Sequence, residues 1–226
     1  MSIVLAFSCT HEPFSKKGYL AFIKQVYKDF NCNAVVCLGD EMDFHRVSFH
    51  DPEPDAKGAV EEYDEALEKM KDYYKAFPKC KVCFSNHTSR PFRLAAKAGL
   101  PSVFVKEYRE FMKAPKGWEW QSEWEVDDVI YTHGEGFGGA IPHLTAVMKR
   151  MQSIVIGHHH RCGGVEYIAN PKQRIFGAST GCGIDAKLYA FRYAKNTTTK
   201  PMIGCVVVID GKEAHYIPME LGRRVK

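Results

Sequence analysis

Five short segments of the sequence carry side chains that bind metal ions, and each follows an apolar run. They are residues 8–11 (Ser-Cys-Thr-His), 39–43 (Gly-Asp-Glu-Met-Asp), 85–87 (Ser-Asn-His), 132–134 (Thr-His-Gly) and 157–160 (Gly-His-His-His). Imidazole, carboxylate, amide oxygen and thiolate are all competent ligands for divalent cations. A single histidine at the end of a strand is usually structural, but five such segments in order are not well explained in that way. The pattern indicates a metal centre assembled from distant parts of the chain.

The apolar runs before these segments predict the strands that position them. Residues 3–7 and 34–38 are continuous apolar runs, and residues 15–30 between them have helical periodicity. A strand–helix–strand order predicts two parallel strands with a crossover helix. We expect further strands at residues 81–84, 126–132 and 153–156. The carboxyl ends of parallel strands in an open α/β sheet meet at one crevice, so the five segments should meet in space.

The rest of the chain predicts an α/β domain with a mixed sheet. Helical patterns occupy residues 59–77, 91–113 in pieces, and 141–151, and short late strands occupy 164–169, 174–178, 202–209 and 214–218. The last two strands flank Asp210-Gly211, which predicts a hairpin. Trp118, Trp120 and Trp124 are placed in a loop before the strand at 126–132. We expect them to pack as a satellite core, and stacking on a base or substrate is the alternative.

Composition limits the class of protein. The 226 residues fit one domain, 1–226, and a hydrophobic content of 45% with 26% charged residues is ordinary for a globular protein. The net charge of +4 permits a polyanionic substrate without requiring one. The chain opens without a secretory signal, so we expect its eight cysteines to be reduced in the cytoplasm. The longest apolar run, Ile203 to Ile209, is too short to span a membrane.

The order, residue types and spacing of the five segments resemble the motifs of the calcineurin-like metallophosphoesterase superfamily. Its pattern is Asp-x-His, Gly-Asp-x-x-Asp, Gly-Asn-His-Asp/Glu, a His often followed by Gly, and Gly-His-x-His. The resemblance runs from Val4 to His160, about two-thirds of the chain. The local sequence Thr-His-Glu-Pro-Phe most resembles that of phage-encoded members. It implies a four-layer α/β/β/α sandwich with mixed sheets and, for a phage protein, a place in the host cytoplasm.

The resemblance also implies a site with two divalent metal ions and a role for each matching residue. The first metal would be held by Cys9, His11, Asp40 and His160, and the second by Asp40, Asn86, His133 and His158. Asp40 would therefore bridge the two ions, and a hydroxide between them would attack phosphorus in line. His87 would protonate the leaving oxygen as the general acid, and Asp43 would orient His87.

Three departures from the family pattern affect this expectation. Cys9 stands where the family has Asp; a thiolate there favours Zn or Fe over Mn or Mg, and the alternative is that Cys9 does not bind metal. Ser85 replaces a Gly, and Thr88 replaces the acid after His87. Phe44 and the following His replace the Arg-Gly of protein phosphatases, which argues against a protein Ser/Thr phosphatase.

The leading function is hydrolysis of a phosphomonoester or phosphodiester, with nucleic-acid ends, nucleotides and cyclic nucleotides as candidate substrates. A nuclease of the same superfamily is the first alternative, and a degenerate member that binds metal or a partner without turnover is the second. His45, Arg46 and Arg90 lie near the ends of the motifs and are candidates for phosphate contacts, against a solvated surface role. No membrane partner is expected, and the sequence leaves the oligomeric state open.

Overall fold

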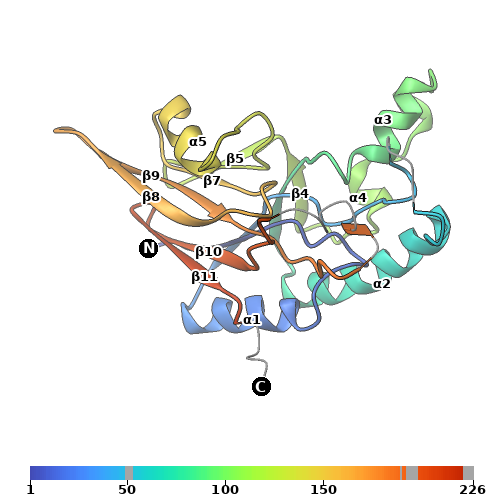
Figure 1. Cartoon of the computed structure of the whole chain (residues 1–226), viewed down its shortest axis with the longest axis horizontal. Helices are drawn as coiled ribbons and strands as arrows, with labels where there is room; N and C mark the ends of the chain where they lie inside the picture. Colours follow the sequence, from blue (N-terminus) through green and yellow to red (C-terminus); the bar gives the residue numbers. More distant parts are fainter. Residues whose placement is uncertain (49–52, 189, 192–197, 221–226) are drawn as a thin grey trace.

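Two mixed β-sheets form the centre of the computed structural model, which describes residues 1–48, 53–188, 190–191 and 198–220 (Figure 1). The first sheet has the strand order β11-β10-β1-β2-β3-β4. Its strands are β1 (Ile3–Phe7), β2 (Ala34–Cys37), β3 (Cys80–Cys83), β4 (Trp118–Gln121), β10 (Gly204–Ile209) and β11 (Glu213–Pro218). The strands β1 to β4 are parallel, and β10 and β11 add at the β1 edge as an antiparallel hairpin.

The second sheet has the strand order β5-β6-β7-β9-β8. Its strands are β5 (Glu123–Val126), β6 (Val129–Thr132), β7 (Ile154–Ile156), β8 (Gly163–Ala169) and β9 (Arg174–Thr180). The three central strands are parallel, whereas β5 and β8 are antiparallel edge strands. The expected parallel pairing of the first two strands and the antiparallel strands late in the chain are confirmed.

Helices cover the outer face of each sheet and the two inner faces pack together. The helices are α1 (Tyr19–Asp29), α2 (Ala59–Ala76), α3 (Arg90–Lys97), the 3-10 helix η1 (Ser102–Phe104), α4 (Tyr108–Phe111) and α5 (Pro142–Arg150). Leu5 and Phe7 of β1 belong to the core beneath α1 and α2, while Val4 and Ala6 belong to the core between the sheets. A third core joins α5 to the second sheet. This arrangement is the expected α/β/β/α sandwich, and it follows from the alternation of side chains along each strand.

The tryptophan segment differs from the sequence prediction. The expected loop is a pair of strands, β4 and β5, that belong to different sheets. The strand expected at 126–132 is interrupted at Asp127 and Asp128, which both have a positive φ, 51° and 61°. Asp tolerates this conformation in two-residue hairpin turns, and the Asp-Asp pair was the signal available in the sequence.

Seven of the eight cysteines are buried, and Cys162 is half-buried. All eight cysteines are free thiols. Cys80 lies in the core beneath the helices and Cys83 in the core between the sheets, so the pair faces opposite ways from β3. Within the described parts of the chain, no helix combines the length and apolarity needed to cross a bilayer.

A candidate metal centre between the two sheets

The loops after five parallel strands meet at one edge of the sandwich. Three of these strands belong to the first sheet and two to the second, so the carboxyl ends of both sheets contribute. The loop after β1 carries Cys9 and His11, that after β2 Asp40 and Asp43, that after β3 Asn86 and His87, that after β6 His133, and that after β7 His158 and His160. The structure therefore brings together all nine residues that the sequence proposed for the site.

Strained backbone is concentrated in these loops. Cys9, His11, Asp40 and His158 have φ angles of 52°, 49°, 53° and 63°, in the left-handed region that non-glycine residues rarely adopt. Each such residue costs about 1–3 kcal/mol and persists only where the surroundings impose it. The first two loops impose it on each other, because the N–H of Cys9 donates to the carbonyl of Gly39 (2.9 Å) and that of His11 to the carbonyl of Asp40 (2.9 Å). Such strain is typical of functional sites.

The first group of donor atoms comprises Cys9, His11, Asp40 and His160, whose ligand atoms all lie within 4.8 Å of one another. His11 Nε2 lies 3.1 Å from His160 Nε2 and 3.5 Å from Asp40 Oδ2. His11 donates its Nδ1–H to Asp43 (2.6 Å), so its Nε2 carries a lone pair that faces other lone pairs. Tetrahedral zinc with Zn–N bonds of ~2.0–2.1 Å would place its ligand atoms about 3.3 Å apart, so the spacing fits a cation.

The second group comprises Asp40, His133 and His158, joined by the amide oxygen of Asn86. His133 Nε2 lies 3.3 Å from Asp40 Oδ2, 2.8 Å from Asn86 Oδ1 and 3.1 Å from His158 Nδ1. His133 donates its Nδ1–H to the carbonyl of Leu38 (2.7 Å), which again leaves the lone pair of Nε2 directed into the group. Nitrogen and oxygen atoms that converge in this way suit a cation between them.

Asp40 stands between the two groups. Its Oδ2 is the atom near both His11 and His133, while its Oδ1 accepts the backbone N–H of His87 (2.9 Å). Burial would raise the pKa of Asp40, but the histidines around it outweigh burial and hold that pKa well below its usual value. Asp40 is therefore ionised, and one oxygen rather than both lies between the donor groups.

Ser85 supports Asp40 in a way that the sequence did not indicate. Its Oγ accepts the backbone N–H of Asp40 at 2.7 Å in the buried interior. A Cβ added at Gly39 would approach the Ser85 Cβ to 2.5 Å, so the two loops pack in close contact. The residue that departs from the family pattern thus satisfies a backbone donor next to the central carboxylate.

Asp43 holds two histidines rather than the one expected. Its Oδ1 accepts the Nδ1–H of His11 (2.6 Å) and lies 3.0 Å from His87 Nδ1. Burial would raise the pKa of Asp43, but the hydrogen bonds from His11 and His87 prevail and lower it. The carboxylate therefore fixes the orientation of a candidate metal ligand as well as that of His87, an arrangement common around metal-bound histidines.

Arg90 is hydrogen-bonded to Nε2 of His87. Its Nη2 donates to His87 Nε2 (3.0 Å), and its Nη1 donates to the carbonyl of Asp43 (2.8 Å). Burial lowers the pKa of His87, but Asp40 and Asp43 outweigh it and raise that pKa above its usual value. In the arrangement observed, Nε2 accepts a hydrogen bond, and it can take a proton only when the guanidinium moves away.

The thiol of Cys9 is completely buried among the first group. Its Sγ accepts the backbone N–H of His158 at 3.3 Å. Burial, and then the charge of Asp40, raises the pKa of Cys9 well above its usual value. A thiol in this position therefore stays protonated unless a cation replaces the proton, since metal binding deprotonates a ligating cysteine.

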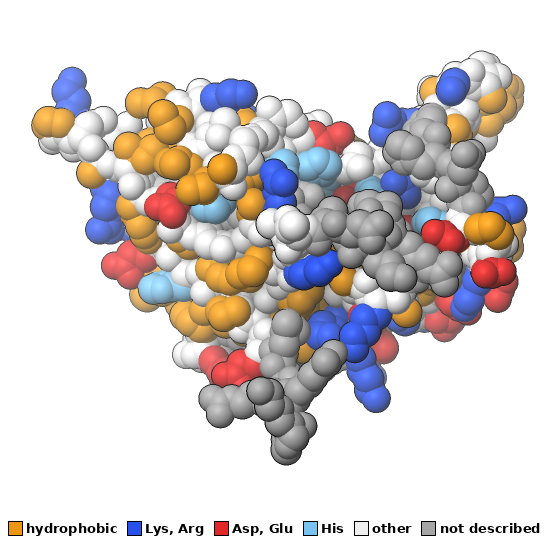
Figure 2. Space-filling view, viewed as in Figure 1, with side chains coloured by type: hydrophobic (Ala, Val, Ile, Leu, Met, Phe, Trp, Pro, Cys, Tyr) orange, Lys and Arg blue, Asp and Glu red, His pale blue; other side chains and the backbone are white. Residues whose placement is uncertain are grey.

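A cavity of about 310 Å³ opens over both groups, and Figure 2 shows His side chains at the surface between the part that carries α5 and the projection that carries α3. Its wall includes Asp40, Asn86, His87, the three consecutive histidines 158–160 and Phe191, whose ring lies 6.5 Å from that of His160. This volume is within the range of small-molecule sites. The candidate ligands are therefore reached from solvent by a small substrate.

Comparisons with known proteins do not identify the function of this chain, so a functional assignment depends on the geometry of the site. No protein-family model matches the sequence, and no curated protein matches it. Solved structures that are similar include Vps29 from Entamoeba histolytica complexed with zinc (11% identity, 94% of this chain and 88% of that chain, TM-score 0.44). Another is YfcE, a phosphoesterase from E. coli (11% identity, 96% of this chain and 100% of that chain, TM-score 0.42). At these identities and TM-scores the comparisons support no conclusion about function.

Proposed function

We propose that this chain is a metal-dependent phosphoester hydrolase of the calcineurin-like metallophosphoesterase type, formed by residues 1–226 as one domain. The observation that carries the proposal is the position of Asp40 Oδ2 between two sets of convergent donor atoms, 3.5 Å from His11 Nε2 and 3.3 Å from His133 Nε2. Two divalent cations held there would supply an activated water nucleophile and offset the charge of the phosphoryl group. Hydrolysis of a phosphoester is the reaction that needs both.

The remaining residues of the site act on the phosphoester itself. His87 stands at the wall of the cavity with its Nδ1 directed at Asp43, so Nε2 is the nitrogen that meets a substrate. Arg90 now bonds that nitrogen. A phosphate oxygen that attracts the guanidinium would free Nε2 to hold a proton, which His87 would then give to the leaving oxygen. In this proposal Arg90 binds phosphate and His87 is the general acid.

The donor set favours zinc or iron in the first group. Cys9 supplies a sulfur atom, and soft sulfur prefers these metals to manganese or magnesium. The second group offers nitrogen and oxygen atoms only, so it suits manganese as well as zinc. The substrate is a phosphomonoester or phosphodiester that fits the cavity, and a nucleotide or a nucleic-acid end has the required group. The closeness to phage-encoded members stays a prediction.

Hydrolysis of a generic aryl phosphodiester and the matching monoester tests the proposal. The protein is stripped with a chelator and then reloaded with zinc, iron or manganese, and metal content is measured beside turnover. We expect no turnover in the stripped protein and recovery on reloading, with close to two ions bound at full activity. Two bound ions without turnover of either ester, with every metal tried, would contradict the proposal and favour a metal-binding protein without catalysis.

A further inference from the structure

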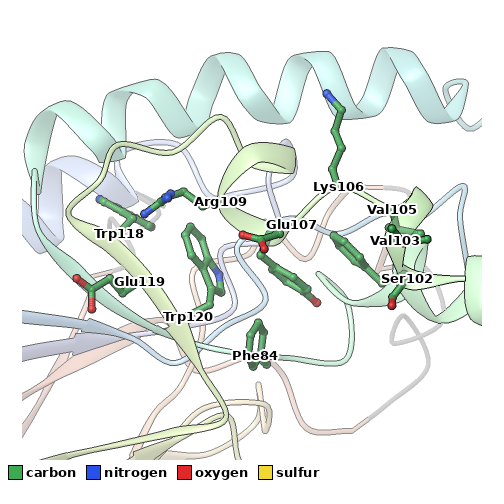
Figure 3. A pocket seen from close by; sticks show the side chains of 12 residues that line it. Phe84, Ser102, Val103, Val105, Lys106, Glu107, Arg109, Trp118, Glu119 and Trp120 are labelled. Atoms are coloured by element: carbon green, nitrogen blue, oxygen red, sulfur yellow. The ribbon is translucent and has the colours of Figure 1, made fainter.

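A second and larger cavity, of about 680 Å³, lies beyond the edge strand β4. Figure 3 shows Trp120 and Phe84 on one side of it and Ser102, Val103 and Val105, in and after η1, on the other. Phe92 of α3 and Tyr108 of α4 complete an aromatic lining. This volume is also in the range of ligand sites, and none of its lining residues has a part in the chemistry proposed above.

The aromatic rings in this cavity are arranged to hold a further flat ring. Phe92 and Tyr108 are stacked with centroids 4.3 Å apart and an interplanar angle of 11°. Phe84 meets Tyr108 edge to face at 4.8 Å, and Phe84 remains 38% exposed. Partly exposed aromatic rings are the usual platforms for stacking a planar ligand.

Polar groups in the lining distinguish a heterocycle from a purely apolar ligand. Lys106 and Arg109 offer donors, while Glu107 and Glu119 offer acceptors, all around the same cavity. Lys106 also pairs with Glu110 at 3.2 Å, so one of its donors is already used outside the lining. Nucleobases combine two flat faces with donors and acceptors along their edges, and they match this lining better than an alkyl chain does.

The aromatic cavity adjoins the metal centre through three connections. Phe84 precedes Asn86 by two residues, so one short segment passes from one cavity to the other. Trp120 donates its indole N–H to Glu41, the buried neighbour of Asp40, at 2.8 Å. Tyr108 lies within hydrogen-bonding reach of Ser89, in the same turn as His87. Residues 84–89 therefore separate the aromatic cavity from the metal centre, and a substrate that occupies both must cross this one short segment.

We infer that the cavity lined by Phe84, Phe92, Tyr108 and Trp120 is a subsite for the nucleobase of a substrate whose phosphate lies at the metal centre. The inference rests on the proposed phosphoester hydrolysis for the position of the phosphate, but base binding is measurable without catalysis. The substrate class is then a nucleotide or a single-stranded nucleic-acid end. The two share the same base and phosphate, and they differ in length.

Binding to the chelated protein tests the subsite separately from the hydrolase. The probes are thymidine monophosphate, deoxyribose phosphate as the match without a base, and a short oligothymidine, each measured by titration calorimetry. We expect thymidine monophosphate to bind and deoxyribose phosphate to bind more weakly by about 5- to 100-fold, the usual effect of one stacked base. A tighter oligothymidine identifies nucleic acid, and equal affinity per base identifies nucleotides. Equal binding of the two monophosphates would overturn the inference.

Variants of Phe84 locate the binding. Phe84→Leu keeps an apolar side chain but removes the ring, and it should lose most of the preference for the base; Phe84→Trp should keep it. Phe104→Ala is the control, because Phe104 is a phenylalanine of the nearby helix η1 that is 72% exposed and lies outside the cavity lining. Loss of the preference in Phe104→Ala, or its retention in Phe84→Leu, would place the base elsewhere.

Steady-state kinetics of two nitrophenyl esters test whether the subsite contributes to catalysis. In the metal-loaded protein, Phe84→Leu should raise KM for the p-nitrophenyl ester of thymidine monophosphate and leave that for methyl p-nitrophenyl phosphate unchanged. If neither ester is cleaved while the base preference persists, the hydrolase proposal fails and the subsite stands. If both esters are cleaved equally well by wild type and Phe84→Leu, the subsite fails and the hydrolase stands.

Discussion

The two donor groups that share Asp40 each combine buried and half-buried ligands, and they differ in chemistry. The first contains Cys9 and His11, which are completely buried, and it combines sulfur with nitrogen. The second contains Asn86 and His158, which are half-buried at the cavity wall, and it combines an amide oxygen with nitrogen. A group with a sulfur ligand suits an ion that stays in place, whereas a group with an amide oxygen at the cavity wall suits an ion that meets the substrate.

The difference also appears in the supporting residues. His11 in the first group is fixed by the ionised carboxylate of Asp43, while His133 in the second is fixed by the carbonyl of Leu38. A carboxylate increases the electron density on a ligating imidazole more than a carbonyl does. Two donor groups that share one carboxylate are therefore chemically unequal. We expect the first group, which contains Cys9 and His11, to retain its ion more firmly than the second.

The largest effect is expected at Asp40, the residue that both groups share. Asp40→Asn removes the negative charge between His11 and His133 while keeping the shape of the side chain. Bound metal should fall in both groups, and turnover should fall by at least about 10²–10³-fold. Metal analysis and steady-state rates check this, with the exposed Asp72→Asn as control. Retention of two ions and near-normal turnover would remove the shared-carboxylate interpretation.

His87 is next, because it acts beside the groups without belonging to the donor sets around Asp40. His87→Ala should keep the metal content and slow esters with poor leaving groups by about 10²–10⁴-fold. Nitrophenyl esters need less protonation and should lose less. A series of leaving groups of increasing pKa, measured for wild type and variant, makes the comparison. A loss that is the same across the series would contradict a general-acid role.

Cys9 tests whether the first group is the softer one. Cys9→Asp should shift its preference from zinc or iron toward manganese, and Cys9→Ser should weaken the first ion by about 10- to 100-fold while the second stays bound. Wild type should also lose activity on thiol oxidation. The half-buried Cys162→Ser is the control. The same metal content and the same order of preference in all variants would show that Cys9 is not a ligand.

The pH dependence of the metal-free protein tests His158, the histidine of the second group at the cavity wall. Burial, then His133, lowers the pKa of His158 to about 4 in the folded state, against about 6.5 when unfolded. Between these values the unfolded chain binds a proton that the folded chain does not, so stability falls as the pH drops from 6.5 toward 4. With discount for solvent, His158 should contribute about 1–3 kcal/mol to that loss.

Urea unfolding in chelator at both ends of this pH window provides the measurement. His158→Gln should lose less stability on acidification than wild type does, while His215→Gln on the exposed side of β11 should behave like wild type. An identical acid response of His158→Gln and wild type would show that His158 is not held neutral in the folded state.

The smallest effect is expected at Ser85, which supports both groups indirectly. Ser85→Ala leaves the buried N–H of Asp40 without its acceptor, and it should lower the free energy of unfolding by about 1–3 kcal/mol. Metal preference should be unchanged, since no ligand is removed. Denaturant unfolding with the exposed Ser122→Ala as control checks this. An unchanged unfolding free energy would mean that another acceptor or water replaces the serine.

Residue types and order in the sequence were sufficient for an α/β fold with a mixed sheet and for the five segments whose ligand residues are now found together, whereas the division into two sheets was implied only by the family resemblance. Apolar runs followed by ligand residues are local signals, and the carboxyl ends of parallel strands meet wherever such strands form a sheet. The hairpin at Asp210-Gly211 is equally local, and both of its turn residues have a positive φ.

Contacts between distant segments required the tertiary structure. Trp118 and Trp124 belong to adjacent strands of different sheets, and the partner across each ladder, not the local pattern, decides that division. The hydrogen bond from Arg90 to the carbonyl of Asp43 and the second histidine on Asp43 depend on how the β1, β2 and β3 loops pack. Side-chain direction and distance between loops follow from packing, and the sequence specifies only which residues the packing has available.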